Sequence, residues 1–310
     1  MSLPLARRTP TTVVTSSYCR QASKLSTSLT YCQDLVKKRD YEHYLSTLLV
    51  PKDARAGAFA VRAFNISIAS VRENSSDSNI SRMRLMFWKE SIDQIYKSGK
   101  PPEQPVLALL AAAIREYRLT KQWLNQLIAS RESRLSDNPF SSINEAERYF
   151  DDTLSPALFL ILQCLRVQSV DADHAASHLS RAQGLVLLVR GIPYFAQQRK
   201  VLLPMDLCVH HGLTQESIVR REVEQPLRDV VYDIAGQAHI HLEKAVNMRE
   251  RLPKAALSAF LPAVSRFPYR YYLYMGALKE LLILDPHGSG TCDVIVRISY
   301  LEAWQVLVHC

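Results

Sequence analysis

The stretch that decides the fold is AQGLVLLVRGIPYF, residues 182–195, which is followed by RKVLLP at residues 199–204. From Ala182 to Val189 nearly every position is apolar, and a helix that is apolar all round is buried inside a protein. Pro193 lacks a backbone N–H and would cost about 3 kcal/mol inside a helix. The stretch therefore predicts a central, buried helix that runs to about Arg190 and ends before Pro193.

Helical spacing of apolar residues extends through most of the chain. Between Ala54 and Val71, and again between Ile80 and Ile95, apolar residues recur every three or four positions, as on the inner face of a helix. The same reasoning predicts helices over residues 103–117, 120–135, 143–165, 226–249 and 254–264, with short elements between 205 and 219. No convincing strand interrupts the series, so the sequence predicts an all-α domain over residues 34–265.

Polar residues mark where several of these helices begin. Asn79 is placed to cap the helix over 79–96, and Ser142 is placed to cap the helix that begins near Ile143. Glu145 stands three residues after Ser142, which is the spacing of a capping box. For the helix that contains residues 182–190, the expected cap is Asp171 or Asp173.

Composition narrows the class of protein. The chain has 310 residues, of which 47% are hydrophobic and only nine are glycine, so it is globular and favours helices. Its formal net charge is +8, but no zinc-finger or RNA-recognition signature accompanies the charge, and no nucleic-acid partner is expected. The six cysteines form no Cys-x-x-Cys pair, which fits a reducing compartment. The longest apolar run, residues 156–165, is too short to span a bilayer.

Both ends of the chain differ from its middle. Residues 1–33 are rich in Ser and Thr, carry four basic residues and contain no acid, as in a mitochondrial transit peptide. A disordered N-terminus of another kind is the alternative. Residues 266–310 are rich in Tyr, and we expect a divergent C-terminal segment there without assigning its structure.

Two other polar clusters have the residue types of a site. His174 and His178 are four apart, as zinc ligands on a helix can be, but no third ligand is placed by sequence, so packing or capping is favoured. The pair Asp151-Asp152 is expected to be a solvated helix edge. The motifs of serine hydrolases, P-loop proteins and dinucleotide-binding proteins are absent from the sequence.

The order of several motifs resembles the squalene/phytoene synthase family. These motifs are YLSTLLVP at 44–51, RAGAFAVRAF at 55–64, AQG at 182–184 and LPMD at 203–206. MFWK at 86–89 and ADHAASH at 172–178 are more similar to the branch of that family that assists the assembly of mitochondrial respiratory complex I. The resemblance covers roughly residues 31–265 and implies an isoprenoid-synthase-like helical bundle.

In enzymes of that family, two aspartate-rich motifs on facing helices hold magnesium ions that neutralise a diphosphate. Carboxylates four apart share one face of a helix, and magnesium requires several oxygen ligands. Aligned to the family, the first motif falls on Ala69 to Glu73 and the second on Gly191 to Phe195, so Glu73 is the one acid at these four positions. Because Pro193 intervenes, the side chains at 191 and 195 are not expected to share a face. The sequence predicts degenerate motifs, with no catalytic residue, cofactor or metal site.

The resemblance also implies a function. It indicates a non-catalytic protein on the matrix side of the mitochondrial inner membrane, in peripheral contact with that membrane. Its partners would be complex I subunits or assembly intermediates, and it would act early, on a membrane-arm subunit. Arg190, Arg199 and Lys200 are the candidate contacts with an anionic surface. Two alternatives remain, a residual prenyl-diphosphate transferase and a metal-free lipid-binding chaperone.

Overall fold

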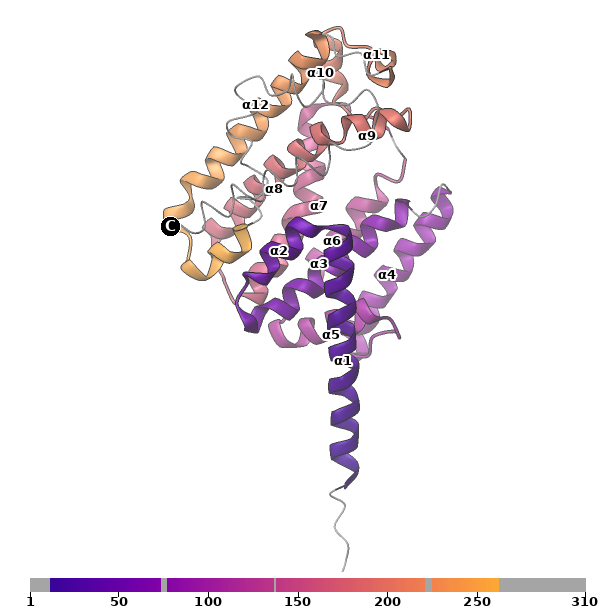
Figure 1. The fold of residues 1–310 in the computed structure, drawn as a ribbon, viewed down its shortest axis with the longest axis vertical. Coiled ribbons are helices and arrows are strands. Elements are labelled where there is room, and N and C mark those ends of the chain that lie inside the picture. Colours follow the sequence, from indigo (N-terminus) through magenta and orange to yellow (C-terminus); the bar gives the residue numbers. More distant parts are fainter. Residues whose placement is uncertain (1–11, 74–76, 137, 221–224, 262–310) are drawn as a thin grey trace, which may run out of the picture.

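The computed structural model describes residues 12–73, 77–136, 138–220 and 225–261, and all the regular structure in these ranges is helical. The predicted all-α class is therefore confirmed (Figure 1). The elements are α1 (Thr12–Arg39), α2 (Tyr41–Leu48), α3 (Lys52–Glu73), α4 (Ser78–Ser98), α5 (Pro105–Tyr117), α6 (Lys121–Glu132), α7 (Ile143–Cys164), α8 (Val170–Arg190), α9 (Ile192–Gln197), α10 (Met205–His210), α11 (Gln215–Val219), α12 (Gln225–Asn247) and the 3-10 helices η1 (Arg249–Arg251) and η2 (Lys254–Phe260).

Helix α8 is central, as the sequence predicts. It packs between α7 and α12, and its residues Ala182 and Leu185 are fully buried. At Gly184 the helix passes so close to α7 that an added Cβ would overlap the ring and the Cβ of Phe150. Glycine is thus required at Gly184 by the close approach of two helices.

Helix α3 organises the other half of the molecule. Its residues Phe59 and Phe64 are fully buried, and the ring of Phe64 meets that of Trp88 on α4 edge-on, with 5.7 Å between ring centroids. An added Cβ at Gly57 would lie 2.6 Å from the Tyr117 ring of α5. This close packing buries α3 against α1, α5 and α7.

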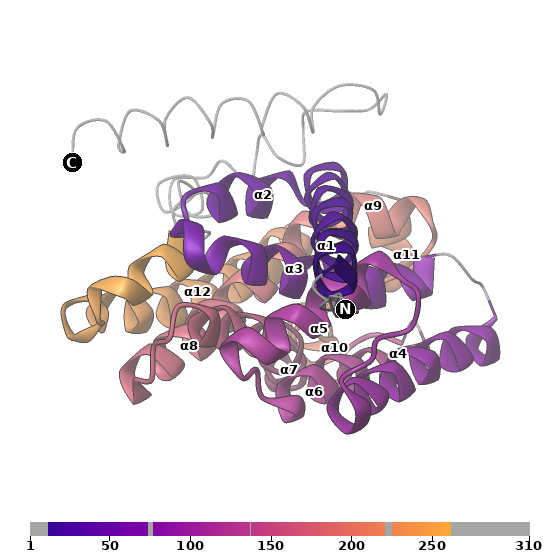
Figure 2. The same ribbon diagram turned by 90° about the horizontal axis from the view of Figure 1, so that it is seen from below.

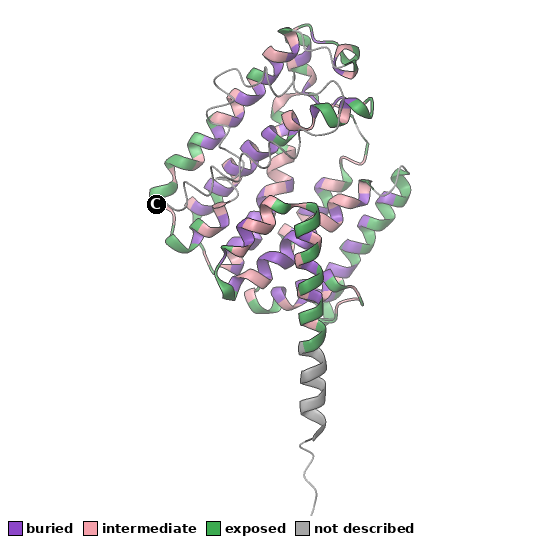
Figure 3. Cartoon of the chain, in the orientation of Figure 1, coloured by how far each residue is buried: buried purple, intermediate pink, exposed green. Residues whose placement is uncertain are grey.

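The apolar core has two parts that α7 and α8 connect. One part gathers around α3 and includes the first half of α8, whereas the other lies between the second half of α8, the first half of α12 and the short helices α9–α11. Figure 3 shows the buried faces of α8 and α12 turned toward each other. The second part of the core therefore fixes the end of α8 and the start of α9.

Two of the predicted helix starts can be compared with the structure. Ser142 caps α7 and accepts a hydrogen bond from the Glu145 backbone N–H at 3.2 Å, which confirms that prediction. The Glu145 carboxylate accepts from Ser141, at 2.6 Å from both its N–H and its hydroxyl. The prediction that Asn79 caps α4 is wrong, because the carboxylate of Asp77 accepts from the Asn79 N–H at 2.7 Å.

Two further boundaries differ from the prediction. Ser169, not Asp171 or Asp173, caps α8. The two carboxylates lie in the first turn of α8, where their negative charge interacts favourably with the positive end of the helix dipole. The helix predicted over 254–264 is a 3-10 helix from Lys254 to Phe260, and its predicted end lies outside the described residues.

Helix α1 crosses the boundary predicted at residue 33. It is continuous from Thr12 to Arg39, and Cys32 and Val36 are fully buried in the core around α3. Burial raises the pKa of the Cys32 thiol to about 12, so the thiol is protonated at neutral pH. In Figure 2, α1 is viewed along its axis beside α2, α3 and α5. The assignment of residues 1–33 stays a prediction, and residues 266–310 lie outside the described ranges.

Candidate functional site

The first predicted motif lies at the end of α3. Ala69 is half-buried on this helix, and Glu73 is its last residue. The Glu73 carboxylate lies 3.2 Å from the guanidinium of Arg39 on α1, and both side chains are about half exposed. The one acid at the four motif positions is therefore held by a cation of the chain itself.

The second predicted motif lies at the junction of α8 and α9. Gly191 ends α8, and Pro193 stands in the first turn of α9, where its missing N–H has no partner to lose. The N–H of Phe195 donates to the Gly191 carbonyl at 2.9 Å, so the backbone continues its helical course. An added Cβ at Gly191 would lie 2.9 Å from the Phe195 ring. The prediction that positions 191 and 195 do not share a face is therefore wrong.

Cations surround the end of α3. Burial lowers the pKa of Arg72, the neighbouring Tyr149 raises it, and Arg134 and Arg131 lower it further. Arg131 donates to the side-chain oxygen of Asn65 at 3.1 Å. Positive charge therefore lies beside the first motif, and it would repel magnesium ions placed there.

These residues do not fit a magnesium cluster. Magnesium requires several oxygens in near-octahedral geometry, whereas Ala69, Gly191 and Phe195 offer no side-chain oxygen and Glu73 offers a single carboxylate. Among the described residues, no group of three or more His, Cys, Asp or Glu side chains is arranged to hold a metal ion.

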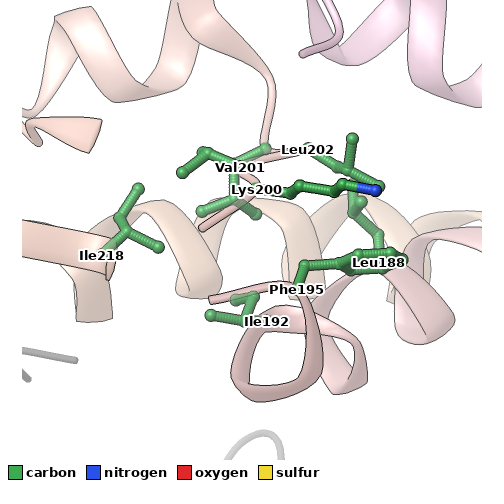
Figure 4. Close-up of a pocket in the computed structure, with 8 residues that line it drawn as sticks. Leu188, Ile192, Phe195, Lys200, Val201, Leu202 and Ile218 are labelled. Carbon is green, nitrogen blue, oxygen red and sulfur yellow. The ribbon is translucent and has the colours of Figure 1, made fainter. Parts of the chain in front are cut away.

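A small apolar pocket lies beside the second motif. Figure 4 shows Lys200 extending over it near Leu188 and Phe195. The pocket measures about 10 Å³, which is room for about one water molecule. A lipid tail does not fit in this pocket as it stands. The full lining is Leu188, Ile192, Phe195, Lys200, Val201, Leu202, Leu203 and Ile218.

The three candidate anion-contacting residues are placed differently from one another. The guanidinium of Arg190 lies 3.6 Å from the Glu42 carboxylate of α2. Arg199 is exposed in a left-handed turn, with φ of 55°, and Lys200 is half-buried at the pocket. Their role at an anionic surface stays a prediction.

A larger hollow of about 910 Å³ lies far from both motifs. It is formed where α5 and α7 end and α6 and α8 begin, about 30 Å along α8 from the second motif. Its lining includes the rings of Trp123 and Phe159, whose centroids are 4.9 Å apart and whose planes are tilted by 55°. Because it lies at the opposite end of α8, it is separate from the position of the family's metal motifs.

His178 has a partner that sequence reasoning missed. Its Nδ1 lies 3.0 Å from Nδ1 of His241 on α12, and Nε2 of His241 lies 3.3 Å from the Glu147 carboxylate on α7. Helical spacing relates His178 to His174, but the ring that His178 contacts is 63 residues away in sequence. These two histidines join three helices by polar packing, whereas His174 is exposed.

This pair predicts a stability that falls in mild acid. Burial lowers the pKa of His178, the charges of His241, Lys244 and Arg181 lower it further, and Asp151 opposes them. Because the folded pKa lies below the unfolded value of about 6.5, the unfolded chain binds more protons between the two values. The free energy of unfolding should therefore decrease as the pH falls from about 6.5 toward the folded pKa, by less than about 1 kcal/mol at this half-buried site.

Urea unfolding at several pH values between 7.5 and 5 measures this effect. A His178→Gln variant removes the titrating ring and should reduce the pH dependence, whereas His174→Gln should retain it. Equal slopes for the wild type and His178→Gln would contradict the prediction.

Asp151 and Asp152 are not a solvated edge, and that expectation is wrong. Asp151 accepts two bonds from the Arg181 guanidinium, at 2.6 and 3.2 Å, and Asp152 accepts from Gln126 at 2.7 Å. Both carboxylates are half-buried because α6 and α8 pack against α7 at this height.

Comparison with known proteins identifies the family. The family model for squalene/phytoene synthase matches residues 36–273, most of the chain, so the chain belongs to the squalene/phytoene synthase family. A solved dehydrosqualene synthase in complex with ligand superposes with a TM-score of 0.76 over 94% of this chain and 100% of that chain, at 17% identity. The fold is therefore that of an isoprenoid synthase.

Two relatives are much more similar in sequence. A Bos taurus protein is 43% identical over 307 residues, which cover 97% of this chain and 90% of the relative. A Homo sapiens protein is 45% identical over 275 residues, covering 89% of this chain and 81% of the relative. Both are named NADH dehydrogenase (ubiquinone) complex I, assembly factor 6.

Proposed function

We propose that this chain assists the assembly of mitochondrial respiratory complex I. The observation that carries the proposal is the 43% identity to a complex I assembly factor over 97% of the chain. A match of this length covers both parts of the core and is not limited to one motif. The partners are complex I subunits or assembly intermediates, and the finer proposal is an early action on a membrane-arm subunit.

The chain acts in this proposal without catalysis. The four motif positions offer a single carboxylate, that of Glu73, and Arg39 binds it. Arg72 adds positive charge at the same end of α3. Magnesium ions that held a diphosphate at these positions would lack the protein oxygen ligands that they require.

The proposed location is the matrix side of the mitochondrial inner membrane, with residues 1–33 acting in import. The packing of Cys32 favours removal of a shorter segment, because a cut after residue 33 would take this fully buried side chain out of the core. Within the described ranges, no helix is both long and apolar enough to cross a membrane.

Depletion of the protein from cells tests the proposal. We expect a several-fold decrease in assembled complex I on native gels, with the other respiratory complexes retained as the internal control. Re-expression of the wild type and of Glu73→Gln should restore complex I equally, because the carboxylate has no catalytic role. The N-terminus of the protein recovered from mitochondria reports where the import segment ends.

The outcomes separate the alternatives. Unchanged complex I after depletion would contradict the assembly role. Magnesium-dependent turnover of a prenyl diphosphate by the purified wild type, absent from Glu73→Gln, would support the residual transferase instead. Co-purifying lipid in native mass spectrometry would support the lipid-binding chaperone.

A further inference from the structure

Helix α4 lies at the outer edge of the molecule and has one face turned away from it. Its inner face, which includes Leu85, Trp88 and Ile92, packs against the core around α3. Figures 1 and 2 both show α4 at the periphery, and Figure 3 shows the exposed side of the helix. The outer face is therefore exposed with respect to the part of the chain that the structure describes.

The first half of this outer face is apolar. It carries four large apolar side chains, which retain between 44% and 70% of their accessible surface. Residues 80, 83 and 87 are spaced by three and four, so they form one strip along the helix, and residue 86 lies beside it. Single exposed apolar residues are ordinary, but a cluster within two helical turns indicates an interaction surface. The four are Ile80, Met83, Met86 and Phe87.

Cations lie on both edges of this apolar strip. Arg82 and Lys89, seven residues apart, fall on one edge, and Arg84 falls on the other. The Arg82 guanidinium is 3.8 Å from Glu132, and both of these side chains are about half exposed. Glu90 ends the strip on its C-terminal side. An apolar sector between two basic edges is the pattern of a helix that lies in the plane of a membrane surface.

We propose that residues 78–89 of α4 dock the protein on an anionic lipid bilayer. Met83 and Phe87 enter the boundary between headgroups and acyl chains, while the aliphatic stems of Arg and Lys lie along it and their charged ends reach lipid phosphates. The occupant is a bilayer because the cations on both edges of the strip complement anionic headgroups, and residues 78–89 contain no acid. The proposal rests on the proposed function only for the identity of the membrane.

Vesicle co-sedimentation tests the proposal with the full chain. We expect binding to phosphatidylcholine vesicles that contain phosphatidylglycerol, and much weaker binding to phosphatidylcholine alone or in high salt. The double variant Met83→Glu and Phe87→Glu should bind at least about tenfold more weakly. Replacing Arg82 and Lys89 by Gln should cost roughly fivefold per cation. Thermal unfolding checks that each variant remains folded.

Val209 supplies the matched control, because it is 74% exposed on α10, away from α4. Val209→Glu should bind vesicles like the wild type. Equal binding to both kinds of vesicle, or anionic binding that the α4 variants do not weaken, would overturn the proposal.

Photo-crosslinking identifies the occupant in mitochondria. A photoreactive amino acid in place of Met83 should crosslink to lipid, whereas a crosslink to another protein or to a second copy of this chain would overturn the proposal. Complex I assembly is measured in the same cells. If the wild type does not bind anionic vesicles but its depletion still decreases assembled complex I, the docking surface is rejected and the assembly role stands.

Discussion

A Gly184→Ala protein is expected to lose about 3 kcal/mol of its free energy of unfolding, because a single methyl group has no room between α7 and α8. The added Cβ would overlap Phe150, and not only at the movable ring: it would also meet the Phe150 Cβ, whose position the α7 backbone fixes. To remove this overlap, α7 and α8 would have to separate along the contact that joins both parts of the core.

Chemical denaturation followed by circular dichroism measures this loss. Gly236, in the middle of α12, supplies the control because nothing lies within 4 Å of an added Cβ there. Gly236→Ala should be neutral or stabilising by up to about 1 kcal/mol, since alanine favours a helix over glycine. Combining Gly184→Ala with Phe150→Ala should cost less than the sum of the two changes. Equal stability of the two Gly→Ala variants would show that the helices have room.

Asp151→Ala is expected to cost about 2–3 kcal/mol, because it removes the acceptor of several charge-assisted hydrogen bonds. The Asp151 carboxylate accepts from Ser155 at 2.5 Å, from Ser177 at 2.7 Å and from Arg181. The variant leaves the Arg181 guanidinium without its partner, and the one-third exposure of that side chain keeps the loss below that of a fully buried pair.

Asp152→Ala is the matched control, since Asp152 is the next residue and accepts a single hydrogen bond from Gln126. Its loss should stay below about 1.5 kcal/mol. Acid adds a second measurement. Burial raises the pKa of Asp151, but the bonds from Ser155, Ser177 and Arg181 outweigh burial and lower it overall. The stabilisation is thus present above the unfolded pKa of about 3.9 and is lost as the pH falls through the folded value. Similar losses for both variants would contradict this account.

Local patterns predicted the elements well. The apolar run from Ala182 to Val189 predicted a buried central helix, and Ser142 was placed correctly as the cap of α7. Helix starts failed where several capping residues stand in a row. Asp77 and Asn79 are both good caps, and the choice between them depends on where the chain leaves the preceding segment.

The candidate site was predicted in part. The residue types at the motif positions are read directly from the sequence, and so is the scarcity of carboxylates there. The surroundings of these positions cannot be read from the sequence, because Arg39 reaches Glu73 from α1 and Arg131 approaches Arg72 from α6. Helical spacing relates neighbours on one helix, whereas these contacts join different helices.

By itself, the sequence determined the helical class, the central position of residues 182–190 and the poverty of oxygen ligands, since each depends on side-chain chemistry repeated at short range. The tertiary structure alone decided that Asp151 meets Arg181 and that His178 meets His241. These pairings arise from the angles and heights at which α7, α8 and α12 pack, which no local pattern in the chain specifies.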